Sequence, residues 1–195
     1  MHLKRKLTIG LFSSLFIIIY YIFLIFNDTP ESSTNQENET RQIITLLLFN
    51  VFNISIWIVL RDLMVTAYNQ SHLSLDFTWF LSLLIILPIA LILFILYKSP
   101  VIFYILITIG IAEIIFLIRL LLKFTRIQKF EIPNIEFLKN FSISVLLVLI
   151  ISIALELIRA LKNLDKFEKI SDSLLIIPYI FLALFFNKER KQVTS

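Results

Sequence analysis

Long apolar runs, each approaching the length that crosses a lipid bilayer, constrain this chain more than any other feature. The clearest pair is 77–97 and 101–122, which are separated only by the short stretch "KSP". About 20 apolar residues in a helix span the hydrocarbon core, and so short a break leaves room only for a tight turn. We therefore predict two antiparallel membrane helices in this part of the chain.

The same kind of run recurs along the sequence, and 58% of the 195 residues are hydrophobic. The predicted spans are 7–26, 43–60, 77–97, 101–122, 141–158 and 173–187. The last is the shortest, so it crosses only with interfacial flanking residues or local thinning of the bilayer, and without it the C-terminus would lie outside. The sequence thus predicts an all-α integral membrane protein, a six-transmembrane-helix bundle that forms a single polytopic domain over 1–195.

Charged residues between the spans predict the orientation. Basic residues precede the first span, fill the inner basic connection 119–140 and follow the last span, whereas the stretch 27–41 is polar and acidic and is predicted to be an exposed loop. With six spans the three basic segments fall on one side and the acidic loop on the other. The excess of Lys and Arg marks the cytoplasmic side, so the N- and C-termini are both expected to be cytoplasmic.

The connection after the fourth span has an amphipathic pattern. At 100° per residue its basic side chains share one helix face and its apolar side chains share the opposite one. The basic set is Arg119, Lys123, Arg126 and Lys129, and the apolar set is Leu120, Leu121, Phe124 and Ile127. We expect this helix to continue until Pro133 and its basic face to be an anionic-lipid-binding site, the alternative being a flank that only fixes orientation.

Glu113 is the most unusual polar residue, because it lies inside the fourth span. A carboxylate at the centre of a membrane helix costs about 2.5 to 3.5 kcal/mol on insertion scales, so it usually faces other helices and has a partner there. Asn50 and Asn53 share a face of the second span. From a rise of about 1.5 Å per residue, Asn53 and Glu113 lie at similar depths. We predict an intramembrane polar cluster of Glu113, Asn50 and Asn53, with a protonated Glu113 hydrogen-bonded to an Asn amide.

This cluster has two interpretations. It joins helices, or it carries a proton or cation during transport. The chain contains only two glycines, Gly10 and Gly110, whereas moving or broken membrane helices favour small residues. The composition therefore favours the structural interpretation.

Enzymatic and metal-dependent functions find little support. The chain has no Cys, and its two histidines, His2 and His72, lie outside the spans and away from any second metal ligand. Asp62 and Asp76 flank the loop that contains His72, and a membrane-surface transferase would use such a pair, but ordinary helix capping also explains them. We predict no catalytic residue, no metal and no cofactor. The net charge of +4 reflects topology, so nucleic acid is not an expected partner.

These observations favour a non-enzymatic multi-pass protein of a cell membrane, acting through contacts with membrane lipids or another membrane protein as an accessory, regulatory or immunity-type subunit, or through self-association. The alternative is a small proton- or cation-coupled transporter or channel that uses Glu113. Richness in Ile, Phe, Asn and Lys is typical of an AT-rich genome and suggests a bacterial plasma membrane. Trp57, Trp79, Tyr97 and Tyr179 need no site, because most lie towards span ends, where such rings rest at the lipid headgroups.

Overall fold

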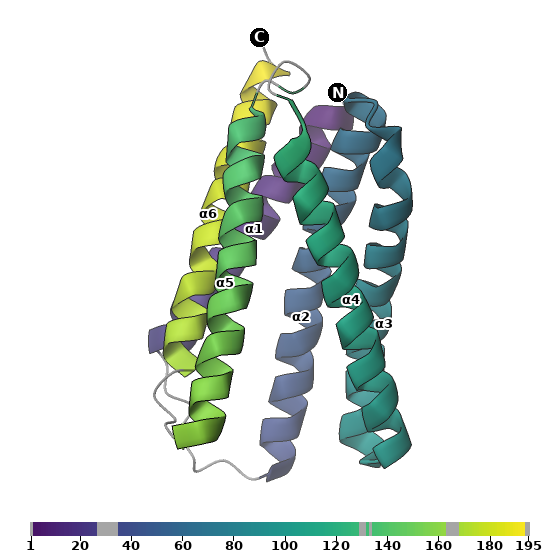
Figure 1. Cartoon of the computed structure of the whole chain (residues 1–195), viewed down its shortest axis with the longest axis vertical. Helices are drawn as coiled ribbons and strands as arrows, with labels where there is room; N and C mark the ends of the chain where they lie inside the picture. The colour runs from purple at the N-terminus through teal and green to yellow at the C-terminus, as the bar shows by residue number, and fades with distance from the viewer. Residues whose placement is uncertain (1, 27–34, 129–131, 133, 163–167, 194–195) are drawn as a thin grey trace. The chain divides into compact units, whose positions relative to one another are not determined.

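A computed structural model describes residues 2–26, 35–128, 132, 134–162 and 168–193, and these residues form helices with no strand (Figure 1). In chain order the elements are α1 (His2–Phe26), α2 (Asn35–Arg61), a π-helical segment η1 (Asp62–Ala67), a 3₁₀ turn η2 (Ser71–Leu73), α3 (Ser74–Tyr97), α4 (Pro100–Arg126), α5 (Ile135–Lys162) and α6 (Glu168–Gln192). The predicted all-α fold is confirmed for the described residues.

Five helical segments within the described residues are long and apolar enough to cross a membrane. They are Leu3–Phe23, Ile43–Ala67, Ser71–Tyr97, Pro100–Arg126 and Ile135–Leu155. The sixth predicted span, 173–187, lies inside α6, which is 25 residues long and therefore about 37 Å from end to end. α6 is not among those five segments, so a sixth crossing stays a prediction, and the fold is compatible with a multi-pass membrane protein.

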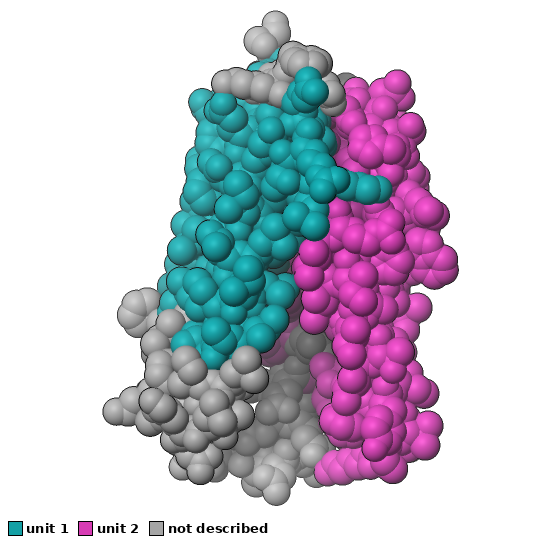
Figure 2. Space-filling view, viewed as in Figure 1, with its two compact units in different colours: residues 1–28, 121–195 teal, residues 29–120 magenta. Residues whose placement is uncertain are grey.

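The described residues group into two compact units (Figure 2). Unit 1 comprises 1–28 and 121–195, and unit 2 comprises 29–120. Unit 1 therefore holds α1, α5, α6 and the last turns of α4, and unit 2 holds α2, α3 and most of α4. This division was not predicted from the sequence, and the single bundle over 1–195 stays a prediction.

Unit 1 is organised around the close approach of α1 and α6. A Cβ atom placed on Gly10 would lie 2.9 Å from Cζ of Phe186, whose ring is fully buried. Further along the same pair, the rings of Tyr21 and Tyr179 are 6.3 Å apart. Because residue numbers rise along α1 while they fall along α6, the two helices are antiparallel. Ser14, also buried in α1, satisfies its hydroxyl by donating to the carbonyl oxygen of Gly10 at 2.9 Å.

Unit 2 begins with a hairpin of α2 and α3. The backbone passes from α2 directly into the π-helical segment and then into a short turn in which Asn69 adopts a positive φ of 54°. Asn tolerates this left-handed conformation better than most residues, because its short polar side chain bonds locally. Trp57 of α2 is buried and packs edge to face on Phe80 of α3, with ring centroids 4.7 Å apart. Trp57 is thus a core residue of this hairpin rather than a headgroup anchor.

The third and fourth spans form the tight hairpin that the sequence predicts. α3 ends at Tyr97, Lys98 has a positive φ of 48° and donates its backbone N–H to the carbonyl oxygen of Phe94 at 2.8 Å, and α4 starts at Pro100. Proline is favourable in the first turn of a helix, where its missing N–H has no partner to lose. The rings of Phe94 and Phe103 then contact across the turn at 5.4 Å.

Two predicted boundaries are wrong. Residues 35–41, placed in the exposed polar loop, belong to α2, whereas 27–34 lie outside the described residues. Glu, Gln and Arg are good helix formers, so a polar segment next to an apolar helix extends it readily. α4 ends at Arg126 instead of continuing to Pro133. Ile127 and Ile132 are buried, and α5 starts at Ile135, so the connection is much shorter than 119–140.

Candidate functional site

An ion pair in unit 2 joins α3 to α4. Asp76 lies in the first turn of α3, and its Oδ1 is 3.2 Å from Nη2 of Arg119, which lies two turns before the end of α4. The Asp76 side chain is 2% exposed and the Arg119 side chain is 55% exposed. A buried carboxylate therefore holds one edge of a guanidinium group whose other edge reaches the surface.

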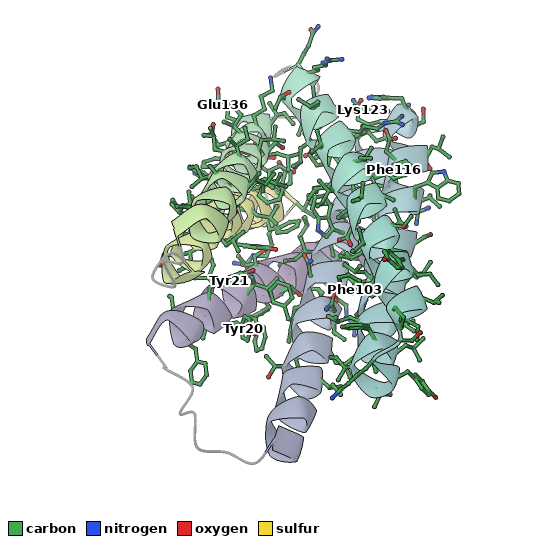
Figure 3. The ribbon with its side chains drawn as sticks, turned by 60° about the horizontal axis from the view of Figure 1, so that its bottom comes forward. Tyr20, Tyr21, Phe103, Phe116, Lys123 and Glu136 are labelled. Atoms are coloured by element: carbon green, nitrogen blue, oxygen red, sulfur yellow. The ribbon has the colours of Figure 1, made fainter. Side chains whose placement is uncertain are left out.

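Two aromatic rings complete this arrangement. Trp79 of α3 and Phe116 of α4 stack with an interplanar angle of 18° and centroids 6.1 Å apart. Cζ of Arg119 lies 5.6 Å from the centre of the Phe116 ring, within cation–π range. Figure 3 labels Phe116 on α4, with Lys123 further along the same helix. We call Asp76, Trp79, Phe116 and Arg119 the Arg119 cluster.

The structure shows on which face of α4 Glu113 lies. α4 presents Tyr104, Ile111 and Ile115 outward, each at least half exposed, whereas Glu113 shares the opposite, less exposed face with Phe116. The Oε2 atom of Glu113 is buried and accepts no hydrogen bond from the described part of the chain. The carboxyl group therefore faces protein on the inner side of α4.

The predicted partners of Glu113 lie in the same unit. Asn50 and Asn53 are both half-buried on α2. No hydrogen bond between either amide and Glu113 is established, so the polar cluster of these three residues stays a prediction.

The amphipathic pattern at the end of α4 is confirmed for the residues that the structure describes. The apolar set, Leu120, Leu121, Phe124 and Ile127, is buried. On the other face Arg119 and Arg126 are exposed and Lys123 is half-buried, and Lys129 lies outside the described residues. The apolar face is covered by the protein itself, so the basic face points outward. Binding of anionic lipid by this face stays a prediction.

A contact in unit 1 fixes where the C-terminal end of α6 lies. Nδ2 of Asn134, immediately before α5, donates to Oε1 of Glu189 near the end of α6 at 2.8 Å, and Glu189 is 2% exposed. The beginning of α5 and the end of α6 are therefore at one end of the unit. The contact of Gly10 with Phe186 brings the beginning of α1 to that same end.

Three segments that are distant in sequence thus meet at one end of unit 1. Their described basic residues are Lys4, Arg5, Lys6, Lys139, Lys188, Arg190 and Lys191. We call this set the basic end of unit 1. The sequence placed these segments on a common side of a membrane by counting spans, and that orientation stays a prediction.

Two of the residues considered for catalysis differ in their surroundings, and the absence of a catalytic role stays a prediction. Asp76 is buried and paired with Arg119, whereas His72 is exposed. In the described parts of the chain, no three His, Cys, Asp or Glu side chains come together in a way that could hold a metal ion.

The ion pair of Asp76 and Arg119 was not predicted from the sequence. The pattern there placed Arg119 on the basic face of its helix and explained Asp76 by helix capping. One signal was available. The two residues are about equally far from the turn at Lys98, so an antiparallel hairpin brings them to the same level.

Comparison with protein-family models, with curated proteins and with solved structures finds no match for this chain. A functional proposal therefore depends on the residues themselves.

Proposed function

We propose that this chain is a non-enzymatic multi-pass protein of the bacterial plasma membrane, with both termini in the cytoplasm, that acts as an accessory or regulatory subunit through contact with anionic lipids and another membrane protein. The basic end of unit 1 carries this proposal. Each Lys or Arg near an anionic leaflet contributes about 1 kcal/mol of attraction at physiological salt. A surface assembled from three segments concentrates that attraction at one end of the helices.

The burial of Glu189 supports a role for this end of the molecule. An acidic side chain among Lys188, Arg190 and Lys191 would reduce the positive potential if it faced outward. Instead it is buried against Asn134, while Lys188 and Lys191 are exposed. The fold therefore separates the acid from its basic neighbours and leaves an outward surface dominated by cations.

The orientation is tested by cysteine accessibility, for which the chain is well suited because it has no native Cys. A single cysteine at Lys188 is expected to react with a membrane-impermeant maleimide only after cells are opened. A single cysteine at Lys98, in the turn between α3 and α4, is expected to react on intact cells. The reverse labelling pattern would place the basic end outside the cell and would contradict the proposal.

The lipid contact is tested with the full chain in nanodiscs of mixed anionic and zwitterionic lipid. We expect anionic lipid to be enriched around the wild-type protein, and Lys188→Gln combined with Lys191→Gln to reduce the enrichment. Lys98→Gln, in the turn between α3 and α4, is the control variant. Equal lipid ratios around all three proteins would contradict the proposal. Co-purification in mild detergent would identify a protein partner.

A second candidate, proton- or cation-coupled transport, is favoured by one observation: a buried oxygen of Glu113 accepts no hydrogen bond from the described residues. An intramembrane carboxyl group with an unused acceptor is available to bind a proton or cation. Purified protein in liposomes would then move protons or monovalent cations, and Glu113→Gln would abolish this movement. Flux that is absent from the wild-type protein would exclude the candidate.

A further inference from the structure

We propose that the Arg119 cluster is a discrete binding site for the phosphate group of a membrane phospholipid. This inference rests on the proposed membrane function and deepens it, because it replaces general attraction at a basic surface with directed hydrogen bonds at one residue. All four residues of the cluster belong to unit 2.

The first step of the argument is the geometry of Arg119. A guanidinium group has five N–H donors in a planar fork, and the fork fits two oxygens of a phosphate group. Asp76 lies 3.2 Å from Nη2, on the buried side. With 55% of the Arg119 side chain exposed, the outer edge of the fork remains available to a ligand from the membrane surface.

The second step is the role of Asp76 as a positioning residue. Its carboxylate is 2% exposed and is fixed in the first turn of α3, so it restrains the arginine before any ligand arrives. A long side chain that is already ordered loses less conformational entropy on binding. Because the ion pair has little net charge, the site depends on hydrogen-bond geometry more than on the total charge of the headgroup.

The third step is the aromatic flank. Trp79 is 52% exposed, and its ring is held parallel to that of Phe116. Trp prefers the headgroup region because it combines a large apolar ring with one N–H donor. Stacked rings beside the guanidinium therefore form a rigid wall at the depth where phospholipid phosphates lie. Trp79 differs in this respect from Trp57, which is buried in the hairpin of α2 and α3.

The affinity is tested by native mass spectrometry of the purified full chain. The probes are phosphatidylglycerol and a diacylglycerol glycoside of the same chain length that lacks phosphate. We expect the first phosphatidylglycerol to bind more tightly than the glycoside. Arg119→Gln should weaken that binding roughly tenfold, the scale of one charge-assisted hydrogen bond.

Two further variants separate binding from folding. Arg119→Lys keeps the positive charge beside Asp76 but removes the fork, so we expect it to weaken phosphatidylglycerol binding while the thermal unfolding temperature stays near the wild-type value. Asp76→Asn should weaken binding with Arg119 still present. Lys98→Gln, at an exposed position in the turn between α3 and α4 and outside the cluster, should leave the first binding event unchanged.

Location is tested in a Trp57→Phe background, in which Trp79 is the remaining tryptophan. A phospholipid with a nitroxide on its headgroup is expected to quench Trp79, and Arg119→Gln should reduce the quenching. Equal affinity and equal quenching for wild type and Arg119→Gln would overturn this site. If Lys188→Gln with Lys191→Gln still removed lipid enrichment, the broader proposal would survive. If neither Arg119→Gln nor the double lysine variant reduced the enrichment of anionic lipid, both this site and the broader proposal would be contradicted.

Discussion

The helices of the two units are held together by different kinds of contact. In unit 1, α1 and α6 approach so closely that the position facing Phe186 is a glycine, and the buried polar residues Ser13 and Ser14 are also small. In unit 2, α3 and α4 contact through long side chains, namely the ion pair of Asp76 with Arg119 and the stacked rings of Trp79 and Phe116.

The difference shows what small residues do in an apolar chain. Within lipid, helices gain little from hiding apolar surface, so they associate by close packing or by polar contacts. Each unit contains one of the two glycines. A Cβ atom placed on Gly110 would lie 3.9 Å from Cδ1 of Leu87, which is an ordinary contact. A Cβ atom placed on Gly10 would lie 2.9 Å from the Phe186 ring. A small residue therefore determines helix contact only where another helix closes on it.

The largest expected effect comes from exchanging these two glycines. Gly10→Ala places a methyl group into the buried Phe186 ring, and overpacking of this kind costs about 2 to 3 kcal/mol of unfolding free energy. Gly110→Ala makes an ordinary contact and should be neutral or stabilising by up to about 1 kcal/mol, because alanine favours helix. Unfolding in mixed micelles measures both values. If both variants behaved alike, the contrast between the units would be wrong.

A somewhat smaller effect is expected from breaking the ion pair in unit 2. Arg119→Leu leaves the buried Asp76 without this cation and should cost about 2 kcal/mol, less than for a fully buried pair because Arg119 is half exposed. Replacing both residues, Asp76→Leu with Arg119→Leu, should recover part of the loss. Thermal unfolding in mild detergent compares the variants, with Arg126→Leu as the control. A double variant no more stable than Arg119→Leu would contradict this account.

Unit 1 should depend less on its own polar contact. Glu189→Ala removes the acceptor for Asn134 and should cost about 1 kcal/mol, the net value of one hydrogen bond. Gln128→Ala, at an exposed position of the same unit, is expected to have no effect. The measurement is again unfolding free energy in mixed micelles. A loss larger than that of Gly10→Ala would show that polar contacts, rather than close packing, hold unit 1.

The smallest effect tests the predicted polar cluster. If an Asn amide bonds Glu113, a double-mutant cycle of Glu113→Leu and Asn53→Leu should show a coupling of about 0.6 kcal/mol, the average for such bonds in a membrane. The same cycle with Asn50→Leu distinguishes the two amides. Zero coupling in both cycles would leave Glu113 without a structural role and would favour its role in transport.

Prediction from the sequence succeeded where local periodicity carries the information. The apolar runs located the helices, and the 100° pattern correctly separated Leu120 and Phe124 from Arg119 and Arg126. Boundaries were less accurate. Polar residues 35–41 continue a helix because propensity favours it, and α4 ends at Arg126, before the predicted stop at Pro133.

Local sequence patterns also do not predict which side chains are buried between helices. Trp57 and Trp79 both lie towards span ends and look equivalent in sequence, yet one is buried against Phe80 and the other is half exposed beside Arg119. Which face of a helix meets a neighbour depends on rotation and crossing angle. Those are set by contacts between segments far apart in the chain.

The sequence by itself determined that this chain is helical, that its helices are long and apolar enough for a membrane, and where its charges end each run. These properties follow from composition and from a period of 3.6 residues, which act locally. Only the tertiary structure decided that Asp76 holds Arg119, that Glu189 is buried against Asn134, and that one glycine lies against a buried ring while the other does not. Each of these depends on the distance between two helices, and that distance is set by how their side chains fit together.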